Sequence, residues 1–120
     1  MDITIIGGSG FLGTRLTERL LITGHRVKIA DRKDSLKYPH LHVFADVRKS
    51  ETLEKALDNS DIIINLAAEH RDDVTPRSLY DDVNITGAEN VCNVCTKLGI
   101  NKIIFTSSVA VYGFAPVGTD

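Results

Sequence analysis

The sequence predicts an α/β fold in which five parallel strands form a doubly wound sheet with helices on both faces. Short apolar, β-branched runs alternate with amphipathic segments along the 120 residues, and this alternation is typical of βαβ units. The run DIIINLAA at 61–68 has no polar alternation, as expected for a strand that is covered on both faces. With right-handed crossovers, the expected strand order is 3-2-1-4-5.

The expected strands are the short apolar runs at 2–6, 26–31, 41–46, 61–68 and 102–108. A first helix follows residues 7–13, since Leu12, Leu16 and Leu20 recur every four residues; Gly24 is placed to end this helix. The polar stretch 32–40, which contains Pro39, is expected to be a loop.

Two further helices complete the alternation. Ser50 is expected to cap one of them, with Leu53, Ala56 and Leu57 on its buried face. The other runs from about 76 or 78 to 98, where Gly99 ends it. Cys92 and Cys95 fall within this last helix. No second Cys or His pair completes a zinc site with them, so we expect small apolar packing side chains and no metal site.

Composition excludes several functions. The net charge of −2 argues against a nucleic-acid partner. No apolar run is long enough to span a membrane, and the first residues lack the basic leader of a signal peptide. We therefore expect a cytoplasmic location and no membrane partner.

The stretch GGSGFLG at 7–13 lies between a strand and a helix, which is the context of a phosphate-binding loop. Gly7 allows the tight turn, Gly10 allows a pyrophosphate to approach the backbone, and Gly13 allows close packing of the helix. The alternative is a plain glycine turn without a ligand. Asp31 ends the second strand, where a carboxylate accepts hydrogen bonds from an adenosine ribose and repels a 2′-phosphate. NAD is therefore favoured over NADP, although Arg32 could pair with a 2′-phosphate.

Five blocks, in this order and spacing, identify a family resemblance. They are GGSGFLG at 7–13, ADV at 45–47, NLAA at 65–68, YDDVNITGAENV at 80–91 and FTSSVAVYG at 105–113. The chain resembles the extended short-chain dehydrogenase/reductase family, especially its NAD-dependent sugar-nucleotide epimerases and dehydratases. The resemblance implies a Rossmann-type domain that binds NAD(P).

The resemblance also implies roles for individual residues. Phe11 and Leu12 would offer backbone N–H groups to the pyrophosphate, and Asp31 and Arg32 would face the adenosine ribose. Asp46 would bond the adenine amino group beside Val47. The other implied cofactor contacts, mostly near the nicotinamide, are Leu66, Ala67, Ala68, His70 and Asn84. Ser108 would be the catalytic serine that hydrogen-bonds the sugar hydroxyl being oxidised. Each also has an ordinary structural alternative, such as a turn acid at Asp46 or small-residue packing in NLAA.

One departure from the family is the missing Tyr-x-x-x-Lys. Tyr38, Tyr80 and Tyr112 are followed four residues later by His, Asn and Pro. We therefore expect residues 1–120 to be an incomplete NAD(P)-binding domain that lacks the sixth strand and the substrate domain. Alone it would be inactive, and it would self-associate through the unpaired edge KIIF at 102–105 or through nearby apolar surface.

The expected function is that of the NAD-binding N-terminal portion of an epimerase, dehydratase or dehydrogenase. The parent enzyme would act on a nucleotide sugar by hydride transfer to NAD. The alternatives are a non-catalytic NAD(P)-binding or sensing module, and a reductase of the same family with a non-sugar substrate.

Overall fold

Five parallel strands form one sheet in the order β3-β2-β1-β4-β5, which confirms the predicted order. The computed structural model of the chain describes residues 1–67 and 85–106. The strands are β1 (Asp2–Ile6), β2 (Arg26–Asp31), β3 (His42–Phe44), β4 (Ile62–Asn65) and β5 (Ile103–Phe105). The helices are α1 (Phe11–Ile22), α2 (Ser50–Leu57) and α4 (Gly87–Leu98), with a short 3-10 turn η1 (Pro39–Leu41) before β3.

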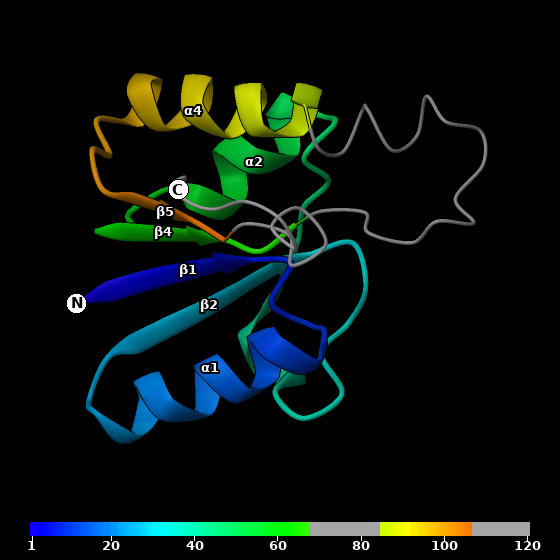
Figure 1. The fold of residues 1–120 in the computed structure, drawn as a ribbon, viewed down its shortest axis with the longest axis vertical. Helices are drawn as coiled ribbons and strands as arrows, with labels where there is room; N and C mark the ends of the chain where they lie inside the picture. The colour runs from blue at the N-terminus through cyan, green and yellow to red at the C-terminus, as the bar shows by residue number, and fades with distance from the viewer. Residues whose placement is uncertain (68–84, 107–120) are drawn as a thin grey trace, which may run out of the picture.

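The sheet lies between two helical layers, with α1 on one face and α2 and α4 on the other (Figure 1). The central strand β1 supplies side chains to both layers because successive residues of a strand point to opposite faces. Ile3 and Ile5 join the apolar cluster beneath α1. Ile6 joins the larger cluster that includes Leu53 of α2 and Val91 of α4. Ile63 and Ile64 of β4 join these two clusters in the same way, so the predicted burial of β4 on both faces is correct.

The carboxyl ends of the strands share one edge of the sheet. Ile6 pairs with Ala30 of β2 and Asn65 of β4, and Asn65 pairs in turn with Phe105. Because all the strands are parallel, the segments that follow them emerge on the same side of the molecule, at the right of Figure 1. Open α/β sheets bind their ligands at this edge.

Three strands are shorter than predicted, and the cap of α2 differs. The predicted runs 41–46, 61–68 and 102–108 contain strands of only 3, 4 and 3 residues in β3, β4 and β5. Ser50 is the first helical residue rather than the cap, which is Lys49. The Thr52 hydroxyl donates to the Lys49 carbonyl at 2.7 Å and steadies this turn instead.

Glycines end two helices as predicted, because each takes a positive φ that other residues adopt with strain. Gly99 has a φ of +77° at the end of α4, and Gly24 has a φ of +91° two residues beyond α1. The predicted start of the long helix, at 76 or 78, lies outside the described residues.

The two cysteines of α4 have different surroundings. Cys95 is buried, as predicted, and burial raises the pKa of its thiol to about 11. The prediction of a packed side chain is wrong for Cys92, which is exposed and lines a shallow hollow with Phe105 of β5. Nowhere in 1–67 or 85–106 do three His, Cys, Asp or Glu side chains gather as a metal site would require.

Within the described ranges, no helix combines the length and apolar character needed to cross a membrane.

The strand at the end of the described sheet, β5, carries two exposed apolar side chains. Ile104 is 52% exposed and Phe105 is 46% exposed. Self-association through this strand stays a prediction.

Candidate functional site

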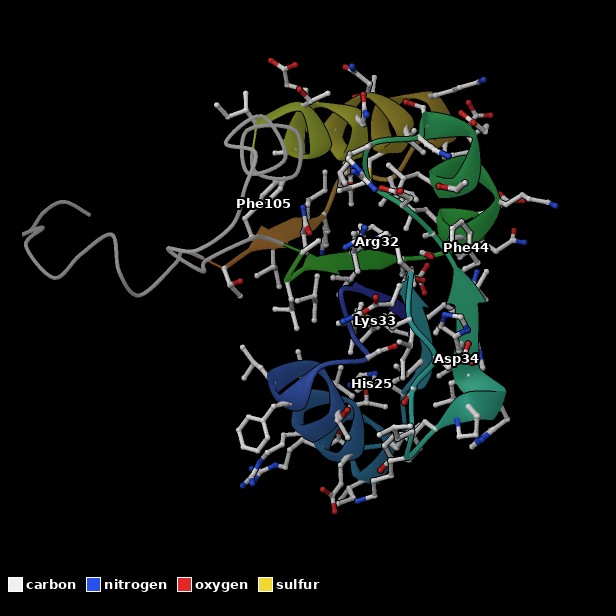
Figure 2. The ribbon with its side chains drawn as sticks, turned by 90° about the vertical axis from the view of Figure 1, so that its right-hand side faces the viewer. His25, Arg32, Lys33, Asp34, Phe44 and Phe105 are labelled. Carbon is white, nitrogen blue, oxygen red and sulfur yellow. The ribbon has the colours of Figure 1, made fainter. Side chains whose placement is uncertain are left out.

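A cleft of about 620 Å³ opens at the carboxyl edge of the sheet. Figure 2 looks onto this edge, with Arg32 and Lys33 near the middle of the view. The segments that line the cleft follow β1, β2, β3 and β4. The predicted site residues that line it are Gly7, Gly10, Asp31, Arg32, Asp46, Val47, Leu66 and Ala67. Ala68, His70, Asn84 and Ser108 lie outside the described residues.

The glycine turn after β1 depends on the absence of side chains. Gly7 has a φ of +79°, and its N–H donates to the Ala30 carbonyl at 2.8 Å. A Cβ on Gly13 would lie 2.5 Å from the carbonyl oxygen of Gly8, so α1 approaches the turn through a contact between two glycines. Gly8 is also buried against Ile29. The sequence reasoning missed Gly8, although the doubled glycine in GGSG was the available signal.

The start of α1 lies at the cleft, which its N-cap residue lines. Gly10 is the N-cap of this helix, no side chain caps it, and its first turn contains no acidic residue. Helix starts leave N–H groups without intrahelical partners, and these groups with the helix dipole favour a bound anion. A Cβ on Gly10 would meet no atom within 4 Å, so the turn has open space in front of it. Phe11 and Leu12 begin α1 with exposed side chains, and their predicted backbone role stays a prediction.

The Asp31 carboxylate links the glycine turn to the loop after β2. One oxygen accepts the Ser9 N–H at 3.0 Å, and the other accepts the Lys33 N–H at 3.0 Å. The Ser9 hydroxyl donates to the Lys33 carbonyl at 2.7 Å. Each carboxylate oxygen can accept a second hydrogen bond, so ribose hydroxyls could still bind at Asp31. The sequence reasoning assigned no role to Ser9.

Asp46 follows β3 and is only 5% exposed. Burial alone would raise the pKa of its carboxyl group, but hydrogen bonds from Arg48 outweigh this effect and leave the pKa below its ordinary value. The Arg48 guanidinium contacts both carboxylate oxygens, at 3.1 and 3.0 Å, and its backbone N–H donates to one of them at 3.0 Å. Asp46 thus acts as a turn acid as well as lining the cleft. The cation two residues after it, in DVR, was the signal that could have found Arg48.

Two asparagines hold the remaining walls of the cleft. The side-chain amide of Asn90, on α4, donates to the Val47 carbonyl at 2.8 Å. Asn65, at the end of β4, accepts the Ala67 N–H at 3.0 Å and turns the chain there. Neither was predicted as a site residue, although both lie in blocks that carry the family resemblance. These contacts fix the backbone of the two segments that line the cleft on either side of the glycine turn.

The cleft has the features of a site for a dinucleotide. The glycine turn and the start of α1 offer backbone N–H groups to phosphates. The Asp31 carboxylate stands beside this turn at the end of β2. After β3, a recess is lined by Ala45, Asp46 and Val47, whose apolar atoms could contact a flat base. The described residues include most of the predicted cofactor contacts, while the predicted catalytic serine, Ser108, lies outside them.

Comparisons with known proteins agree with this interpretation. The model of the NAD dependent epimerase/dehydratase family matches residues 3–119. The N-acetyl-alpha-D-glucosaminyl-diphospho-ditrans,octacis-undecaprenol 4-epimerase of Escherichia coli O157:H7 is 49% identical over 112 residues, which cover 93% of this chain and 34% of that protein. The human decarboxylating sterol-4-alpha-carboxylate 3-dehydrogenase is 33% identical over 109 residues, 90% of this chain and 29% of that protein. The chain therefore spans about a third of the length of the curated relatives it matches.

Solved structures show the same architecture. The UDP-glucose 4-epimerase of Thermus thermophilus, in complex with NAD, superposes with a TM-score of 0.79 at 26% identity, over 90% of this chain and 38% of that one. The UDP-glucose 4-epimerase of Bifidobacterium longum, in complex with NAD+ and UDP, gives a TM-score of 0.81 at 27% identity, over 94% and 38%.

Proposed function

We propose, from the premise that this chain belongs to the NAD dependent epimerase/dehydratase family, that residues 1–120 form the NAD-binding domain of an enzyme acting on a sugar diphosphate. The cleft at the carboxyl edge is the observation that carries this proposal. It is lined by the glycine turn after β1, by Asp31 at the end of β2 and by Ala45, Asp46 and Val47 after β3. In this proposal these three segments would hold the pyrophosphate, the ribose and the adenine of NAD. Because the chain spans about a third of its relatives' length, the activity of the whole protein is part of the proposal.

The residues present fit this cofactor. The uncapped start of α1 and the open space before Gly10 suit a pyrophosphate. Asp31 would accept hydrogen bonds from the adenosine ribose, and Asp46 and Val47 would bind the adenine. Leu66 and Ala67 would line the nicotinamide side. When bound, NAD would supply the acceptor for a hydride taken from a sugar carbon.

The charge of Asp31 favours NAD over NADP. A 2′-phosphate placed about 4 Å from this carboxylate would be repelled by about 4 kcal/mol at an effective dielectric near 20. Arg32 and Lys33 line the same cleft and would offset part of this repulsion. We propose that the acid dominates, because its backbone partners hold it beside the glycine turn.

A nucleotide sugar is the proposed substrate, and a lipid-linked sugar diphosphate is the second candidate. The UDP-glucose epimerases among the structural neighbours support the first. The name of the relative at 49% identity, which specifies a glucosaminyl-diphospho-undecaprenol, supports the second. In either case Ser108 would be the catalytic serine, and Ala68, His70 and Asn84 would complete the cofactor contacts.

Calorimetric titration tests the cofactor proposal directly. The 120-residue chain is titrated with NAD, NADP and ADP-ribose, and we expect NAD to bind about tenfold more tightly than NADP, or better, because of the repulsion at Asp31. Asp31→Asn removes the charge that should disfavour NADP, and Asp61→Asn is its control. Asp61 accepts the Asp2 N–H and does not line the cleft, so the Asp61→Asn chain should bind NAD normally. Heat signals indistinguishable from dilution with all three ligands at millimolar concentration would refute the proposal.

The substrate proposal needs the full-length protein that carries these residues. Incubation with NAD and UDP-N-acetylglucosamine, or with the corresponding undecaprenyl diphosphate sugar, should yield an epimer that chromatography and NMR detect. A protein that binds NAD yet leaves both substrates unchanged would remove the substrate class and leave the cofactor assignment standing.

A further inference from the structure

We propose that Ser9 is a positioning residue whose hydroxyl holds the glycine turn (residues 7–10) against the ribose loop (residues 31–34). This inference rests on the proposed function, since it concerns how the cleft receives the adenosine diphosphate part of NAD. Ser9 is half-buried and lines the cleft. Its side chain supplies a direct bond between a segment that follows β1 and a segment that follows β2.

Three hydrogen bonds close a ring between the two segments. The Ser9 N–H and the Lys33 N–H donate to the two oxygens of Asp31, both at 3.0 Å. The Ser9 hydroxyl donates to the Lys33 carbonyl at 2.7 Å. The first two bonds use backbone donors that any residue except proline would supply. The third needs a hydroxyl at position 9, so it is the bond that the identity of Ser9 determines.

The turn needs such a bond because its neighbours give it little rigidity. Glycine loses more conformational freedom on folding than other residues, and Gly7, Gly8 and Gly10 surround Ser9. A hydroxyl bonded to a main-chain carbonyl fixes one backbone relative to the other and adds no charge near the phosphate position. The bond thereby sets the separation between the donors for the pyrophosphate and the acceptor for the ribose.

Ligands of different length should respond differently to this separation. NAD and ADP-ribose would contact the glycine turn and the ribose loop at once, so their affinity depends on how the two are placed. Adenosine has no phosphate and would contact only the ribose loop and the adenine recess. A residue that positions the two segments should therefore affect the long ligands and leave adenosine unchanged.

The test compares Ser9→Ala, Ser9→Thr and the matched control Ser50→Ala, which removes a serine at the start of α2 that does not line the cleft. Loss of one neutral hydrogen bond should weaken NAD and ADP-ribose by about two- to tenfold in Ser9→Ala. Ser9→Thr keeps the hydroxyl at a position without a positive φ and should bind like the wild type. Adenosine binding, followed by NMR titration, should be equal in all variants.

A second measurement needs no ligand. Hydrogen exchange of the Ser9→Ala chain should be faster at the amides of residues 9 and 33, while Ser50→Ala should leave them unchanged. Equal affinity of Ser9→Ala and wild type for NAD would overturn the inference. So would an equal loss for adenosine, which would make Ser9 a support of the ribose loop alone. Failure of the wild type to bind NAD would refute the proposed function, and the exchange rates would still report whether the hydroxyl joins the two segments.

Discussion

Replacing Gly13 by alanine separates the packing role of the glycine motif from its binding role. A Cβ at this position would lie 2.5 Å from the carbonyl oxygen of Gly8 and still closer to its Cα. Both neighbours are backbone atoms, which cannot rotate away as a side chain can. We therefore expect α1 to shift outward from the glycine turn in this variant.

The energetic effect follows from the size of that shift. Adding a methyl group to a well-packed site destabilises a fold by about 1–3 kcal/mol. At about 4 °C per kcal/mol for a chain of this length, the midpoint of thermal unfolding should fall by about 4 to 12 °C. The stabilising effect of removing a glycine from the unfolded chain, about 0.4–1 kcal/mol, offsets only part of this.

Gly10→Ala is the matched control, because a Cβ there would meet no atom within 4 Å. Loss of glycine at the N-cap lowers the free energy of unfolding, whereas the reduced freedom of the unfolded chain raises it. The two effects oppose each other, so stability should change by less than about 0.5 kcal/mol. Its Cβ would project into the space proposed for the pyrophosphate, so NAD binding should weaken. Urea unfolding, thermal unfolding and NAD titration of both variants measure these effects. Equal stability of Gly13→Ala and the wild type would refute the packing argument.

The remaining predictions concern charge and reactivity. Asp31→Asn should reduce the ratio of the NADP to the NAD dissociation constant by about fivefold to several hundredfold, since a repulsion of about 1–4 kcal/mol disappears; an unchanged ratio in parallel titrations would contradict this. Arg48→Met should destabilise the chain by about 1–3 kcal/mol at about pH 7, because it leaves the carboxylate of Asp46 buried without its cation. The pKa of Asp46 is lowered in the fold, so its pairing with Arg48 stabilises the fold above the unfolded pKa of about 3.9. This stabilisation is lost as the pH falls through the folded pKa. Denaturation between about pH 3 and pH 7 should therefore show the stabilities of the wild type and Arg48→Met converging at the acidic end. Iodoacetamide at about pH 8 should alkylate exposed Cys92, whereas Cys95, buried with a pKa of about 11, should react only after unfolding; equal rates by mass spectrometry would disprove the difference.

The sequence predicted the sheet order because few topologies satisfy its alternation of strands and helices. A strand, a glycine turn and a helix in succession require a parallel crossover, and its handedness is nearly fixed. The same rule placed Asp31 and Asp46 at one edge, because the ends of parallel strands coincide there. These parts of the site depend on the position of a residue along its own strand, which a sequence shows directly.

Contacts between distant segments could not be predicted in this way. Asn90 and Val47, whose hydrogen bond crosses 43 positions of the chain, meet only because α4 packs beside α2. Strand lengths were overestimated for a related reason. β4 can pair no further than its neighbours extend, and Asn65 turns the chain by accepting the Ala67 N–H. Local apolar character does not encode either limit.

The position of β1 in the sheet also determines when the fold can close during synthesis. β1 precedes the other four strands of this sheet along the chain, yet it is the central one, with β2 on one side and β4 on the other. Its second edge stays unpaired until Ile62–Asn65 have left the ribosome. During that interval the apolar run DITII presents an open edge that other chains could join. We expect this non-local pairing of β1 with β4 to slow folding and to lengthen the exposure of that edge to aggregation.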